Sequence, residues 1–162
     1  MKIVSSDELR HHRGISFVGV STCFFCYDKN GRIFMAKRNA NARDENGNWD
    51  IGAGGLELGL TAEDNMKKEI KEEYNAESLK TTFLGYRNVF RKLADGAKTH
   101  WLALDFAVLV DPKFVKVNEP HKFDDSGWFT MDSLPSPLHS QINSFMSVYD
   151  KQLRDLISSA QK

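Results

Sequence analysis

The sequence contains no apolar run that approaches the roughly 20 residues needed to cross a membrane as a helix. Its N-terminus also lacks the pattern of a secretory signal peptide. Neither sign of charge predominates, because 22 Lys and Arg residues balance 22 Asp and Glu residues. This balance disfavours bulk attraction to nucleic acid or to an anionic membrane. We therefore expect a cytoplasmic protein that binds neither.

Cysteine is scarce, and the two cysteines, Cys23 and Cys26, lie in the segment GVSTCFFCY. This segment is typical of a strand, in which residues three apart point to opposite faces. A structural zinc site would need two more ligands, and a redox pair is expected at a helix N-terminus. We therefore interpret both cysteines as buried core thiols.

The length of the chain suits one domain with a substantial core, and no internal repeat or low-complexity tract divides it. We expect a single domain over residues 1–162, with its core over about residues 15–157. Residues 1–14 are polar, and we interpret them as an exposed segment or a first edge strand.

Segments rich in β-branched and aromatic residues predict strands. These segments are 15–27, 32–38, 49–51, 78–91 and 100–110. Helices are predicted from Thr61 and over about residues 138–157, where the apolar side chains share one face. We interpret that face as core packing, with a dimer contact as the alternative, and residues 116–127 as irregular. Strands with one helix between them and another at the end predict an α/β layered domain.

The stretch AGGLELGLTAEDNMKKEIKEEYNA, residues 53–76, joins a glycine-rich loop to a helix. Gly54 and Gly55 let the backbone bend tightly and approach a ligand closely. Thr61 is a good N-cap, and Asp64 three residues later completes something close to a capping box. Bare backbone leading into a helix is suited to holding a phosphate chain.

Three carboxylates follow in this helix, at Glu69, Glu72 and Glu73. Spacings of three and four place them along one side of the helix. Like charges repel, and magnesium or manganese would supply the counter-charge that carboxylate oxygens prefer. The alternative is a solvated acidic face interspersed with lysines.

This stretch resembles the signature of the Nudix hydrolase superfamily. The signature is a glycine, five residues, a glutamate, seven residues, then Arg-Glu-aliphatic-any-Glu-Glu-any-Gly-aliphatic. Gly54 takes the first position, and residues 68–76 take the last nine. The likeness covers roughly residues 15–157, and this box is its only highly specific part.

Three box positions differ from the family pattern. Leu60 replaces a glutamate that in the family lies near the metal cluster, a loss that could cost about a hundred- to ten-thousand-fold in rate if that group is the general base. Lys68 replaces the arginine; it keeps the charge that would orient Glu69 but loses the planar fork. Asn75 replaces a glycine and tolerates the left-handed conformation of a helix C-cap. Glu57, a frequent family glutamate, is intact.

The resemblance implies an α/β/α sandwich with a mixed β-sheet. It also implies Mg²⁺-dependent hydrolysis of a pyrophosphate bond in a nucleoside diphosphate linked to another group, with Mn²⁺ as an alternative ion. By the same resemblance the metal ligands would be the carbonyl of Ala53 together with Glu69, Glu72 and Glu73. Gly54 and Gly55 would contact the substrate, and Lys68 would serve the catalytic site by orienting Glu69.

Other polar residues are candidates outside the box. The family resemblance implies a further carboxylate from a later loop, as metal ligand or base, and Glu119 is the candidate because NEPHKFDDSGWF resembles the E-P-x-K stretch of Nudix enzymes that act on nucleoside triphosphates. Asp124 and Asp125 are rivals, and a solvated loop is the alternative. Arg38 is a candidate phosphate ligand or a surface salt bridge. Asp105, among apolar neighbours, either bonds a structural group or reads a base edge.

The favoured substrate is a nucleoside triphosphate, with a nucleotide sugar or ADP-ribose as alternatives. Leu60 supports a second hypothesis, a nucleotide-binding module with weak or no turnover. The candidates for base stacking, each of which is more often a core residue, are Trp49, Trp101 and Trp128. The protein is expected to be a monomer or a homodimer.

Overall fold

The computed structural model describes residues 5–42 and 44–162. Within these residues the elements are, in chain order, α1 (Ser6–Arg10), β1 (Gly19–Tyr27), β2 (Arg32–Arg38), β3 (Trp49–Asp50), β4 (Gly52–Gly55), α2 (Ala62–Tyr74), β5 (Ser78–Lys92), β6 (Lys98–Val110), β7 (Phe123–Thr130) and α3 (Ser140–Ala160). No helix in these ranges has the length and apolar character needed to cross a membrane.

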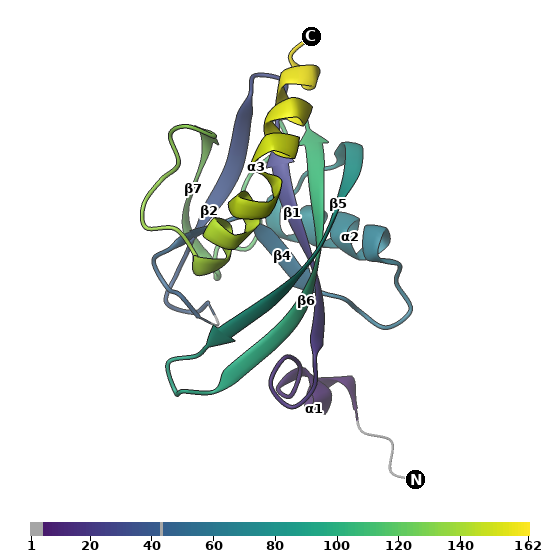
Figure 1. Ribbon diagram of the computed structural model, residues 1–162, viewed down its shortest axis with the longest axis vertical. Helices are drawn as coiled ribbons and strands as arrows, with labels where there is room; N and C mark the ends of the chain where they lie inside the picture. Colours follow the sequence, from purple (N-terminus) through teal and green to yellow (C-terminus); the bar gives the residue numbers. More distant parts are fainter. Residues whose placement is uncertain (1–4, 43) are drawn as a thin grey trace.

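The strands form one mixed sheet whose main path runs β3-β2-β1-β6-β5. β1 and β6 are parallel over their whole shared length, whereas the other pairs are antiparallel. β4 pairs with β1, and β7 pairs with β2. Figure 1 shows α3 in front of the sheet and α2 behind it. The predicted α/β/α sandwich with a mixed sheet is therefore confirmed.

The side chains of β1 alternate between two apolar clusters, one under each helix. Phe24 and Cys26 pack in the cluster that contains Met66 and Ile70 of α2. Phe25 and Tyr27, which alternate with them along the strand, belong to the cluster under α3. The buried residues that α3 contributes to this cluster are Ile142, Phe145, Tyr149, Leu153 and Ile157. A strand in the middle of a sheet covered on both faces is apolar on both sides, which explains its continuous apolar run.

Both cysteines are free and buried, as predicted. Cys26 lies in the cluster under α2, whereas the thiol of Cys23 is within 3.8 Å of the side-chain oxygen of Gln141 in α3. They therefore lie on opposite faces of the sheet. Burial raises the pKa of Cys23 to about 12 and raises that of Cys26 as well, so both stay protonated thiols.

The predicted ends of α2 are confirmed. The side chain of Thr61 accepts a hydrogen bond from the backbone N–H of Asp64, and Asn75 adopts the left-handed conformation with φ of 50°. The backbone N–H groups of Lys116 and Asn118 donate to the last carbonyls of the helix, at 3.1 and 2.8 Å. The segment after β6 is thereby fixed against the C-terminus of α2.

Two local predictions were wrong, and one of the two alternatives for the N-terminal segment fails. Ser6–Arg10 is a short helix with a capping box at Ser5 rather than an edge strand, residues 8–12 are exposed, and residues 1–4 lie outside the described residues. The predicted first strand begins at Gly19 rather than at residue 15. Residues 123–130 form β7, because antiparallel pairing with β2 supplies the hydrogen bonds that a polar segment does not reveal in sequence.

Truncation of the core under α3 tests this packing. Phe145 is 0% exposed and stacks on Phe25 with ring centroids 5.9 Å apart. We expect Phe145→Ala to lower the free energy of unfolding by about 3–5 kcal/mol, because it removes buried surface and leaves a cavity. Val148→Ala, on the exposed side of the same helix, is the control and should stay within about 0.5 kcal/mol. Chemical denaturation measures both, and equal effects would contradict the assignment of faces.

Candidate functional site

The predicted glycine loop begins inside the sheet, because Gly54 and Gly55 belong to β4. Thr22 of β1 faces Gly54 in the β1–β4 register, and its hydroxyl accepts a hydrogen bond from the side chain of Asn65 at 2.9 Å. Asn65 also accepts from the backbone N–H of Glu57 at 3.0 Å. This fully buried asparagine, which the sequence analysis did not single out, fixes the loop and α2 to each other.

Gly54 is required by the close approach of a carboxylate. A Cβ atom placed on Gly54 would lie 2.0 Å from the side-chain carboxyl carbon of Glu69. Any larger residue would therefore displace Glu69. The glycine acts here by leaving room for a side chain rather than through backbone freedom.

Glu73 is the most unusual carboxylate of the site. It is 6% exposed, and its Oε2 has no hydrogen-bond partner among the described residues. Burial raises the pKa of Glu73 well above its usual value; Lys122 offsets part of this, whereas Glu69 and Glu119 add to it. Glu69 is half-buried, and burial raises its pKa as well. The positive charge of Lys68 offsets part of that rise. Buried ionised oxygens are costly unless a cation or donor reaches them.

Glu72 and Lys68 form a pair on the more exposed side of the helix. The ammonium of Lys68 lies 2.7 Å from Glu72 and 3.3 Å from Glu57, and the carboxylate of Glu72 is about half exposed. The structure thus groups Glu69 with Glu73 and places Glu72 beside a lysine. The roles of Glu72 as a metal ligand and of Lys68 as the residue that orients Glu69 stay predictions.

The described residues contain no ready-made cluster of three or more His, Cys, Asp or Glu in metal-binding geometry. Ala53, Gly54, Glu69 and Glu73 nevertheless line one pocket of about 530 Å³. An unpartnered carboxylate oxygen, a second carboxylate and bare backbone are the hard oxygen donors that magnesium prefers. The residues present therefore fit a divalent cation.

The segment between β6 and β7 brings further charge to this pocket. Lys122 lines the pocket with Glu69 and Glu73, and its ammonium is 2.6 Å from Glu119. Asp124 and Asp125, the rivals of Glu119, are exposed. The sequence analysis missed Lys122, whose place depends on the contacts that fix this segment to α2.

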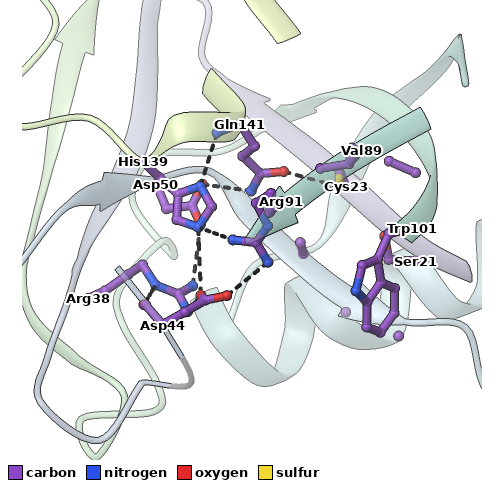
Figure 2. Close-up of a pocket in the computed structure, with 14 residues that line it drawn as sticks. Ser21, Cys23, Arg38, Asp44, Asp50, Val89, Arg91, Trp101, His139 and Gln141 are labelled. Carbon is purple, nitrogen blue, oxygen red and sulfur yellow. Dashed lines mark hydrogen bonds and ion pairs between the residues drawn. The ribbon is translucent and has the colours of Figure 1, made fainter. Parts of the chain in front are cut away.

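A second pocket, of about 190 Å³, shares Gly54 and Gly55 with the first. Figure 2 shows it lined by Trp101, Cys23 and Gln141 on one side and by a network of charged side chains on the other. Trp101 also lines the first pocket. The two pockets therefore adjoin across β4.

The charged network consists of Arg38, Arg91, His139 and three carboxylates. Arg38 lies 2.8 Å from Asp44 and 3.3 Å from Asp50, and Arg91 lies 2.8 Å from Asp44. Burial alone would raise the pKa of Asp44, but the hydrogen bond with His139 and the two guanidinium groups lower it. The arginine that the sequence offered as a phosphate ligand or a salt bridge is thus engaged in ion pairs.

His139, Arg91 and Asp44 are site-lining residues that the sequence analysis missed. His139 is the N-cap of α3, and its Nε2 lies 3.0 Å from a guanidinium nitrogen of Arg91 in β5. The residues come from separate segments of the chain, and no spacing in the sequence connects them. A histidine directly before the amphipathic helix was the one available signal, because that position caps the helix.

Asp105 has a structural partner. It is fully buried, and Arg87 donates two hydrogen bonds to it, at 2.7 and 2.9 Å. The hydroxyl of Tyr149 donates a third at 3.1 Å. These contacts agree with the structural alternative, and a role of Asp105 in reading a base edge stays an untested prediction.

Comparisons with known proteins agree with this geometry. A family model described as NUDIX domain matches residues 18–149. The fold is similar to a MutT NUDIX hydrolase from Burkholderia pseudomallei, at 25% identity and a TM-score of 0.70, over 82% of this chain and 98% of that one. It is also similar to a MutT protein from Methanosarcina mazei Go1, at 17% identity and a TM-score of 0.69, over 83% and 94% of the two chains.

The NUDIX domain of Shewanella oneidensis NrtR, solved in complex with ADP ribose, has 10% identity and a TM-score of 0.66, over 93% of this chain and 99% of that one. At that identity the likeness shows the fold alone. The family match spans most of the chain and includes the helix that carries Glu69 and Glu73. The chain therefore belongs to the NUDIX family and is a Nudix pyrophosphohydrolase, an enzyme that cleaves the pyrophosphate bond of a nucleoside diphosphate linked to another group.

Proposed function

We propose that the protein hydrolyses a nucleoside triphosphate with the help of magnesium, and that the reaction takes place in the pocket over β4. The observation that carries this proposal is the buried oxygen of Glu73 beside Glu69, which has no hydrogen-bond partner among the described residues. A cation-binding pair of carboxylates adjoining a pocket lined by an indole suits a phosphate chain attached to a base.

Glu69, Glu73 and the carbonyl of Ala53 would hold the metal, with Glu72 as a further ligand assigned from the family pattern. When bound, magnesium, or manganese in its place, neutralises phosphate oxygens and acidifies water. Gly54 keeps the space that Glu69 occupies. Lys122 adds a positive charge on the side of the segment before β7.

Glu119 is the proposed general base. Its carboxylate is held by Lys122 and lies near enough to Glu73 to raise the pKa of that residue. A positioned carboxylate that accepts a proton typically contributes about a hundred- to ten-thousand-fold to a rate. Glu119 would thus be the base in place of the glutamate that the family pattern has at the position of Leu60.

The smaller pocket in Figure 2 would receive the nucleoside. Trp101 offers an indole face for stacking, and Gln141 and Asp50, which line the same pocket, offer polar atoms. In this proposal Arg38 holds the wall of the pocket through Asp44 and Asp50. A cytoplasmic location would keep Cys23 reduced.

Two alternatives remain within the family. The NrtR domain was solved with ADP ribose, which supports ADP-ribose or a nucleotide sugar as an alternative substrate. Leu60, which is 37% exposed in the loop before α2, supports a nucleotide-binding module with weak turnover.

Removing the charge of Glu73 tests the site. We expect Glu73→Gln to lower kcat/KM by at least about a hundred-fold, because the amide is a poorer ligand for a hard cation. Phosphate release from a nucleotide panel measures this loss. Glu63→Gln, an exposed glutamate of the same helix paired with Lys67, is the control and should hydrolyse like wild type. A Glu73→Gln enzyme of normal activity would move the reaction to another site.

Metal binding can be measured without turnover. Magnesium at about 100 times its Kd should raise the Tm of the wild type by about 5–10 °C, because it binds only the folded state. A protein in which Glu69 and Glu73 are both replaced by Gln should show little of this shift. Differential scanning calorimetry with magnesium and with EDTA compares the two, and equal shifts would contradict the assigned ligands.

Restoring the family glutamate separates an enzyme from a weak binding module. Because Glu119 is the proposed base, we expect Leu60→Glu to change kcat by less than about threefold. Leu58→Glu adds the same charge at an exposed position of the same loop that also lines the pocket, so it shows whether any effect is specific to position 60. A gain of about a hundred-fold or more for Leu60→Glu alone would mean that the natural chain lacks an effective base, and it would favour the binding module.

A further inference from the structure

Two arginines from the N-terminal segment line the pocket that holds Glu69 and Glu73. Arg10 is the last residue of α1, and Arg13 lies three residues further along the chain. Both precede residue 18, where the match to the NUDIX family model begins. Figure 1 shows α1 beside the start of β1 and at the opposite end of the molecule from the C-terminus of α3. This chain therefore adds positive charge to the site from outside the matched region.

Arg13 is held in place. Its Nη1 donates a hydrogen bond to the carbonyl of Leu56 at 3.3 Å, and a Cβ atom placed on Gly55 would lie 2.7 Å from Nη1. Gly14, with φ of +78°, packs so closely on Trp101 that a Cβ atom there would lie 2.2 Å from the indole nitrogen. The backbone N–H of His100 also donates to the carbonyl of Gly14 at 2.8 Å. The half-buried guanidinium is thus fixed against β4 rather than free in solvent.

These two arginines differ from the others in their ion pairs. Among the side chains that the structure describes, no carboxylate lies within 4.0 Å of the guanidinium of Arg10 or Arg13. Every other arginine that the structure describes forms an ion pair; these are Arg32, Arg38, Arg87, Arg91 and Arg154. Arg10 and Arg13 line the pocket where the proposed reaction places a phosphate chain.

We propose that Arg13, assisted by Arg10, binds the terminal phosphoryl group of the substrate and selects substrates that end in a phosphoryl group over those that end in a neutral group. A guanidinium offers parallel N–H donors that match phosphate oxygens two at a time. The carboxylate of Glu69 packs against Gly54 and the guanidinium of Arg13 packs against Gly55, so successive residues of β4 separate the metal side from the arginine side. A neutral sugar offers this arginine no charged partner. The inference rests on the proposed function and specifies the substrate class of the same site.

The first test measures anion binding without catalysis. Inorganic tripolyphosphate is titrated calorimetrically into the metal-free protein in EDTA at low ionic strength. We expect Arg13→Gln to weaken binding by about ten- to a hundred-fold, the effect of losing hydrogen bonds to a charged group. Arg13→Lys should bind with intermediate affinity, and Arg10→Gln should show a smaller loss. Arg154→Gln, which removes the same charge from the far end of α3, should bind like wild type.

The second test separates specificity from structure. With magnesium, Arg13→Gln should raise KM for a nucleoside triphosphate by about tenfold or more while changing kcat/KM for a nucleotide sugar by less than about threefold. A loss that is equal for both substrates would show a structural role for Arg13 and overturn the inference. Unchanged tripolyphosphate binding, or no binding by the wild type, would overturn it as well.

The two proposals can fail separately. If the wild type hydrolyses no nucleotide but Arg13→Gln still loses tripolyphosphate, the proposed function fails and the anion site stands. If the wild type hydrolyses a triphosphate and Arg13→Gln behaves like Arg154→Gln in both tests, the anion site fails and the proposed function stands. Arg10→Gln changes an exposed residue, so its result does not depend on the folding of the segment around Gly14.

Discussion

The site depends on one buried carboxylate, that of Glu73, one oxygen of which has no hydrogen-bond partner in the part of the chain that the structure describes. Glu73 lies near the C-terminal end of α2, and its backbone carbonyl accepts a hydrogen bond from Asn118 at 2.8 Å. The same hydrogen bond helps to fix the segment that carries Lys122 and Glu119. The residue that most needs a cation thus also helps to position the charges around it. A buried carboxylate of this kind destabilises the folded protein when no cation is bound, and a cation that binds to it stabilises the folded protein.

The two adjoining pockets differ in how their charges are arranged. In the smaller one, Arg38 and Arg91 form ion pairs with Asp44 and Asp50, so the network stabilises a wall. In the larger one, no ion pair joins Arg10 or Arg13 to Glu69 or Glu73 among the side chains that the structure describes, and the Oε2 of Glu73 has no hydrogen-bond partner there. A cavity with unsatisfied charges of both signs suits a ligand that carries metal and phosphate together. The ion pairs of the smaller pocket therefore fix its shape, whereas the charged groups of the larger pocket supply binding energy for a ligand.

The departures from the family box have different physical consequences. Asn75 adopts the left-handed conformation with φ of 50°, so the helix ends as it would with glycine. Lys68 keeps a positive charge beside Glu69 but directs its hydrogen bond to Glu72 at 2.7 Å. Leu60 is partly exposed and contributes no carboxylate. Of the three changes, the one at Leu60 alone removes a charged group, so it bears most directly on the proposed chemistry.

The sequence by itself determined the elements whose signals are local: the strand at Arg32–Arg38, the capped helix at Ala62–Tyr74 and the amphipathic helix near the end. Caps and periodicity act over a few residues, so they can be read without a fold. It also determined the spacing that places Glu69 and Glu73 on one side of a helix. Only the tertiary structure decided which charges meet there, because Arg13, Lys122, Arg91 and His139 come from segments far apart in the chain. Their positions depend on strand pairing and on backbone hydrogen bonds between distant residues, which no local pattern encodes.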